Sequence, residues 1–168
     1  HIRFRIRLKI SGIDLEKRRY TMCQSYKLAC TCNQNTAEIF FGKMVLNETA
    51  IEEVYCPQCS QAVDGKHASR VWDNGWVLEM NMDAVRQYAG SMGISPHELT
   101  AEKVFDDGYA TWVGITPDDT ERRNKERDEI QKLAKSDVLA YYEAMKEWGL
   151  NREKRFSDEG WRKMRVPQ

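Results

Sequence analysis

Hydrophobic and polar residues alternate one by one at the start of the chain. Isoleucine, phenylalanine and leucine occupy the even positions of residues 2–10, and arginine or lysine occupies each position between them. A period of two is typical of a β-strand with one buried face. We therefore expect residues 2–10 to form an edge strand whose cationic outer face discourages unwanted pairing.

A second β-rich stretch covers residues 26–60. Apolar, β-prone runs separated by turn-like polar residues predict strands at 26–30, 37–46 and 51–55. Further along, Asp73-Asn74-Gly75 stands between two tryptophans and predicts a hairpin over residues 71–82, because asparagine and glycine tolerate positive φ.

The period of the apolar residues lengthens after residue 82. Short helices are expected at 83–91 and 95–105, the second of them opened by Ser95-Pro96, in which serine caps the helix and proline suits its first position. Together with the preceding strands, these helices predict an α+β fold with a β-rich region at 1–82 and a helical region at 83–168.

A long helix is expected in the C-terminal half. Thr116-Pro117 is a second capping sequence, and the helix that it opens is predicted to cover residues 117–148 and to end at Gly149. The first half of this helix is almost wholly charged, whereas the second half carries an apolar stripe at helical spacing. Ser157 is expected to open one more short helix that carries Trp161.

Four of the five cysteines form two close pairs, C-x-C at Cys30 and Cys32 and C-P-x-C at Cys56 and Cys59. Zinc prefers four soft ligands in a tetrahedron, and two ligands in one tight turn can both point at the same ion. The β-prone residues between the pairs can bring the two turns together. We therefore expect these four cysteines to bind one metal ion.

This arrangement resembles the zinc-ribbon superfamily. The resemblance covers residues 26–60 and implies a β-hairpin metal knuckle with the four cysteines as ligands. The first pair of this chain has one intervening residue, whereas the commonest zinc-ribbon pattern has two. The superfamily serves many functions, so the resemblance names no function here.

Other uses of the cysteines remain open at this stage. Iron in a rubredoxin-like site would use the same four sulfurs and would make the protein an electron carrier. The C-P-x-C sequence also occurs in thiol-disulfide oxidoreductases, where a following helix activates the thiol. Cys23 is the unpaired fifth cysteine and is able to replace Cys30 or Cys32 as a ligand.

The charge of the chain narrows the choice of partners. It has 26 basic and 26 acidic residues among its 168, so the net charge is zero. A neutral total argues against a general nucleic-acid binder, which needs a basic face.

The close cysteine pairs suit a reducing compartment, so a cytoplasmic location is expected. No apolar run is long enough to span a bilayer, and Met22 is a potential natural start, in which case residues 1–21 would be an extension.

The remaining motifs give weaker functional hypotheses. Ala89, Gly93 and Leu99 match three positions of a DNA-binding helix-turn-helix, but the recognition helix expected at residues 97–103 carries two acids and one lysine. His67 and His97 lie in contexts that suggest no catalytic dyad, and no catalytic constellation is evident.

The sequence therefore predicts a non-catalytic, metal-stabilised adaptor or accessory subunit of a larger assembly. Zinc is the expected metal and iron the alternative. A charged helical segment with no apolar stripe has little to bury within its own chain. A protein partner is accordingly expected to bind the basic strand at residues 2–10 and the long helix at 117–148.

Overall fold

The computed structural model describes residues 24–162. The strand predicted at residues 2–10 and Cys23 lie outside these residues. The predicted α+β class is confirmed, because the described chain forms two small antiparallel sheets and a mostly helical C-terminal half.

Each sheet has three strands, and the two sheets draw on different parts of the chain. The first sheet has the order β1-β2-β6, with bounds Gln24–Ala29, Thr36–Phe41 and Ala110–Ile115. The second has the order β3-β5-β4, with bounds Ile51–Tyr55, Trp76–Met80 and Arg70–Asp73. Because β6 pairs with β2, the first sheet joins the β-rich half of the chain to the helical half.

Two sharp turns explain where the strands end. Strand β2 stops at Phe41, earlier than the predicted run to residue 46, and Gly42 passes so close to the backbone that a Cβ there would lie 2.0 Å from the carbonyl oxygen of Gly108. The hairpin of β4 and β5 turns through Asn74 and Gly75 with φ of 47° and 78°, as the sequence predicts.

The core lies between the two sheets. Trp76 from β5, Trp112 from β6 and Trp161 from the C-terminal segment are all buried, and their ring centroids lie 5.4–6.3 Å apart. Gly114 leaves the space that the ring of Trp76 occupies, since a Cβ there would lie 2.1 Å from a ring carbon. The three tryptophans thus fix the two sheets against each other.

The short helices follow β5 and differ in part from the prediction. They are α1 Met82–Gln87, α2 Ala89–Met92 and α3 Ala101–Asp106. The predicted helix start at Ser95-Pro96 is wrong, because residues 96–98 form only a turn. Thr100 caps α3 instead, and its side chain accepts a hydrogen bond from the backbone of Lys103 at 3.1 Å.

The predicted long helix at 117–148 is wrong in its length, because it is two helices. Helix α4 covers Pro117–Leu133 and α5 covers Val138–Asp158. The predicted helix start at Thr116-Pro117 is confirmed, and Thr116 and Asp119 form a capping box there. Asp137 starts α5 by accepting from the backbone of Ala140 at 3.0 Å. The predicted helix end at Gly149 is also wrong, because α5 continues through this glycine to Asp158, at a cost of about 1 kcal/mol relative to alanine.

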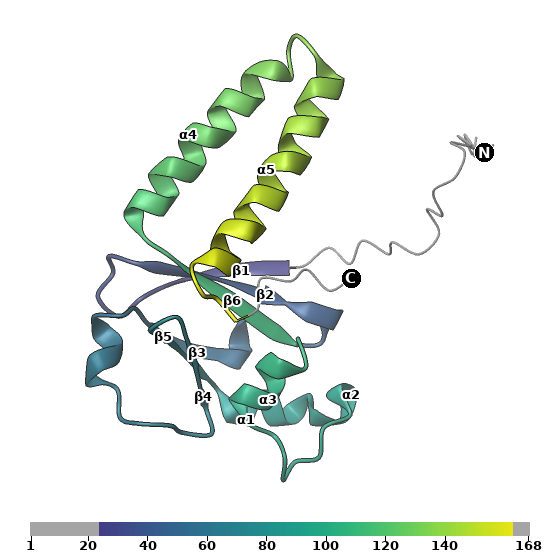
Figure 1. Ribbon diagram of the computed structural model, residues 1–168. Coiled ribbons are helices and arrows are strands. Elements are labelled where there is room, and N and C mark those ends of the chain that lie inside the picture. The colour runs from purple at the N-terminus through teal and green to yellow at the C-terminus, as the bar shows by residue number, and fades with distance from the viewer. Residues whose placement is uncertain (1–23, 163–168) are drawn as a thin grey trace, which may run out of the picture.

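The two helices form an antiparallel hairpin on the first sheet, and the second sheet with α1–α3 lies on the other side of that sheet (Figure 1). Glu126 of α4 binds α5, accepting from the indole of Trp148 at 2.8 Å and from Arg155 at 3.3 Å. Polar contacts therefore help to join the two helices, and α4 has no fully buried residue.

Polar contacts also fix the helical hairpin to the first sheet. Glu38 of β2 is 5% exposed, and one of its carboxylate oxygens lies 3.1 Å from Arg123 of α4 and 2.9 Å from Arg152 of α5. A single buried carboxylate therefore anchors both helices to β2.

Candidate metal centre

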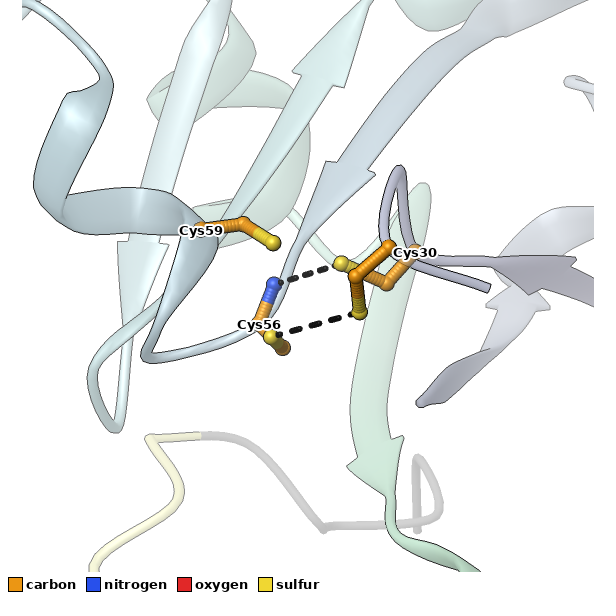
Figure 2. Close-up of side chains that lie close together, drawn as sticks. Cys30, Cys56 and Cys59 are labelled. Atoms are coloured by element: carbon orange, nitrogen blue, oxygen red, sulfur yellow. Dashed lines mark hydrogen bonds between the residues drawn. The ribbon is translucent and has the colours of Figure 1, made fainter. Parts of the chain in front are cut away.

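The two cysteine pairs lie in two turns that face each other, one turn from each sheet. Cys30 directly follows β1, and Cys32 lies in the turn that leads into β2. Cys56 directly follows β3, and Cys59 opens a 3-10 turn, η3, at Cys59–Ala62. Figure 2 shows this cluster at the point where the first sheet meets the second.

The four thiols lie close enough to hold one ion. All four Sγ atoms lie within 4.8 Å of one another, and Cys32 and Cys56 are 3.9 Å apart. A zinc ion bound by four sulfurs at about 2.3 Å separates them by about 3.8 Å. The thiols are all free, and no disulfide joins them. The sulfur atoms therefore fit a tetrahedral metal ion.

The first turn is built by its own backbone. Asn33 has a φ of 58°, and its N–H donates to the carbonyl of Cys30 at 2.7 Å, while the N–H of Cys30 donates to the carbonyl of Asn35 at the same distance. Asparagine tolerates the left-handed conformation better than most residues. The polar residues between the first two predicted strands thus form a tight turn, and it directs both thiols of the pair to one side.

The second turn is fixed from two directions. Ser60 donates its N–H to the carbonyl of Cys56 at 2.8 Å, and its hydroxyl donates to the carbonyl of Gly75 in the β4–β5 turn at 2.8 Å. The N–H of Cys56 donates to the sulfur of Cys30 at 3.1 Å (Figure 2). This last contact joins the two turns to each other.

Backbone N–H groups favour the thiolate form of one cysteine in each turn. The N–H of Gln34, with help from that of Asn35, lowers the pKa of Cys32. Burial raises the pKa of Cys56, but the N–H of Cys59, the side chain of Asn35 and other donors outweigh it and bring this pKa to about 6. Donors of this kind stabilise the negative sulfur that a metal requires.

The pKa of Cys59 shows the effect of placing four sulfurs close together. The hydroxyl of Thr31 lowers the pKa of Cys59, but the thiol of Cys30, burial and the other two thiols raise it to about 11. The pKa of Cys59 thus shifts in the direction expected when a further negative charge meets repulsion from neighbouring sulfurs. A divalent cation at the centre would offset this repulsion, which is why such a cluster fits a metal better than four separate thiols.

The arrangement is suited to joining parts of the fold. Cys30 and Cys56 are buried, and Cys32 and Cys59 are half-buried. Beside the cluster, the N–H of Thr31 in the first cysteine turn donates to the carbonyl of Val54 in β3 at 3.3 Å. Four protein sulfurs fill a tetrahedral shell, so an ion there would have no open position for a substrate.

The structure brings together all four predicted cysteines and places His67 and His97 elsewhere. His67 hydrogen bonds with Ser69 at 2.8 Å and is not part of the cysteine cluster. His97 lies in the turn that precedes α3. Sequence reasoning missed Thr31 and Asn35, whose side chains face the sulfurs, because a polar residue beside a cysteine carries no distinctive signal.

The local structure differs from what the thiol-disulfide oxidoreductase and helix-turn-helix hypotheses require. The last cysteine of C-P-x-C opens the four-residue turn η3, and this is not an α-helix whose dipole would activate the thiol. In the helix-turn-helix alignment, α2 has a single turn and Leu99 precedes α3, so residues 97–103 do not form the expected recognition helix.

No protein-family model matches this chain, and neither the curated proteins nor the solved structures gave a match. The site and its surroundings therefore carry the functional argument. Among the helices of residues 24–162, none combines the length and the apolar character that crossing a membrane requires.

Proposed function

We propose that this protein is a zinc-stabilised, non-enzymatic adaptor or accessory subunit. The observation that carries the proposal is the cluster of four cysteine sulfurs, all within 4.8 Å of one another, between the two sheets. A metal ion bound there holds the turn after β1 against the turn after β3. Its role is to stabilise the fold that presents the interaction surfaces, and not to activate a substrate.

Zinc is proposed because of the ligand set. Thiolates select zinc or iron over harder ions, and zinc in a four-sulfur shell is the common structural form. The turns of a zinc-ribbon-like knuckle supply backbone donors to the sulfurs, as the N–H groups near Cys32 and Cys56 do here. Iron in the same shell is the alternative and would indicate electron transfer.

The adaptor role is proposed because of the helical hairpin. Among residues 24–162, helices α4 and α5 project from the first sheet with no further helix beside them (Figure 1), and most of their residues are exposed. A helix pair of this length without a third helix packed along it presents a large surface to a partner. Together with the basic residues 2–10, it forms the proposed contact surface for other proteins.

Elemental analysis of the purified chain with an absorption spectrum tests the metal. We expect about one zinc per chain and no visible colour. A red sample with sulfur-to-iron charge-transfer bands would support the iron alternative and reject zinc. Replacing Cys56 by serine is expected to abolish stoichiometric metal binding, whereas Cys23→Ser is the matched control and should bind normally.

Co-purification from native extract tests the adaptor role. We expect the metal-loaded chain to elute in a complex with another protein, and we expect that complex to be lost when charges on α4 are reversed. A chain that binds zinc but elutes without any partner across several extract preparations would argue against the role while leaving the metal centre intact.

A further inference from the structure

The outer face of α5 carries a symmetric pattern of exposed side chains. Leu139 and Leu150 are 78% and 58% exposed, and between them lie the exposed charges of Glu143 and Lys146. These four positions are spaced four, three and four residues apart, so they form one stripe along the helix, about 16 Å long. Exposed leucines at both ends of one stripe have no role in the core of this chain.

This stripe points away from α4. The contacts of α5 with the rest of the fold come from its other side, where Trp148 binds Glu126 and Arg152 binds Glu38. Glu143 and Lys146 take part in none of the ion pairs found among residues 24–162. The leucines and the charges of the stripe are therefore available to a partner.

We infer that the partner of this stripe is a second copy of the chain. Read backwards, the stripe is leucine, lysine, glutamate, leucine. An antiparallel second copy therefore places each leucine beside a leucine and each charge beside its opposite. When two α5 helices pair antiparallel about a two-fold axis, Leu139 meets Leu150 of the second copy, and Glu143 meets Lys146 of the second copy. Both contacts occur twice.

The charges of the stripe favour this antiparallel register over a parallel one. No like charges face each other in this arrangement, whereas a parallel pairing would put Glu143 against Glu143. The inference rests on the proposed role of the helical hairpin as an interaction surface, and it leaves the face of α4 open for a different protein.

A single helix pair is a small interface, below about 1,200 Å² in total, so the dimer is expected to be weak, with a dissociation constant of about 1–100 µM. Sedimentation of the full, metal-loaded chain between 1 and 300 µM is therefore the measurement. We expect a reversible monomer–dimer equilibrium. A chain that stays monomeric throughout this range overturns the inference, and its zinc content still tests the proposed function separately.

Charge reversal tests the register. With either Glu143→Lys or Lys146→Glu alone, residue 143 of one copy meets a like charge at residue 146 of the other, and this contact occurs twice. Each variant is therefore expected to weaken the dimer by about tenfold or more. Equal amounts of the two variants should form a mixed dimer, and the double variant should dimerise like the wild type. Only a contact between copies gives this rescue.

Glu129→Lys is the matched control, because Glu129 is an exposed acid of α4 that pairs with Lys132 three residues on. It changes the same charge on the same helical hairpin and should leave the dissociation constant unchanged. Metal content and circular dichroism confirm that each variant is folded. A dimer that survives Glu143→Lys, or a mixture of the two single variants that stays monomeric, overturns the inference.

Discussion

Replacing Glu38 by glutamine is expected to lower the free energy of unfolding by about 2–4 kcal/mol. The carboxylate of Glu38 holds α4 and α5 on the first sheet, since one oxygen accepts from Arg123 at 3.1 Å and from Arg152 at 2.9 Å. Glutamine keeps the size of the side chain and removes its charge. Two guanidinium groups then lie side by side with no anion between them.

The magnitude follows from how far these groups are removed from water. The side chain of Glu38 is 7% exposed, and those of Arg123 and Arg152 are 21% and 17% exposed. Burial, followed by the charge of Arg123, lowers the pKa of Arg152, so this cation depends on its carboxylate. Removing one member of a fully buried pair costs about 3–5 kcal/mol, and the partial exposure of the arginines reduces that figure.

Urea unfolding followed by circular dichroism measures this change. Replacing all three charged residues by leucine should recover most of the lost stability, because it removes the unpaired charges as well as the pair. Glu129→Gln on the exposed side of α4 is the control and should not move the midpoint. If Glu38→Gln unfolds within about 0.5 kcal/mol of the wild type, the carboxylate does not anchor the helical hairpin.

Three further predictions concern the core, a buried acid and the metal. Gly114→Ala should destabilise the fold by about 2 kcal/mol or more in urea unfolding, since its methyl group would overlap the ring of Trp76, whereas Gly65→Ala, with open space around it, should not. Burial raises the pKa of Asp73 above its usual 3.8, so the native state holds this proton more tightly than the unfolded chain does; Asp73→Asn should therefore be more stable relative to wild type at pH 7 than at pH 4, and an unchanged difference would contradict this. Removing the metal with a chelator should lower the melting temperature, and a weaker effect in Cys23→Ser than in wild type would show that Cys23 is a ligand.

Local patterns in the sequence predict the elements that local residues determine. The cysteine pairs, the Asn74-Gly75 turn and the helix start at Thr116 are each specified within a few residues, and all three appear as expected. The spacing of Cys30 and Cys32 needs only a tight turn to direct two thiols to one side. Such features are visible in the sequence because their physical cause lies within a single turn of the chain.

The features that the sequence does not reveal depend on distant residues. Glu38 lies 85 residues from Arg123 and 114 from Arg152, so no local pattern marks it as an anchor. The break between α4 and α5 is equally hidden, because residues 134–137 contain no proline or glycine. Within this stretch, only Asp137 marks the start of α5, and its capping bond forms where α5 folds back along α4.

The metal centre and the base of α5 are connected through the β4–β5 turn. Ser60 of the second cysteine turn donates to the carbonyl of Gly75 at 2.8 Å. Two residues earlier, the carboxylate of Asp73 accepts from the backbone N–H of Arg162 at 3.1 and 3.2 Å, just after Trp161 enters the core. The same short turn thus contacts the cysteine cluster on one side and the segment that ends α5 on the other. Because each contact restricts the conformations of this turn, we expect metal binding and the anchoring of the helical hairpin to stabilise one another.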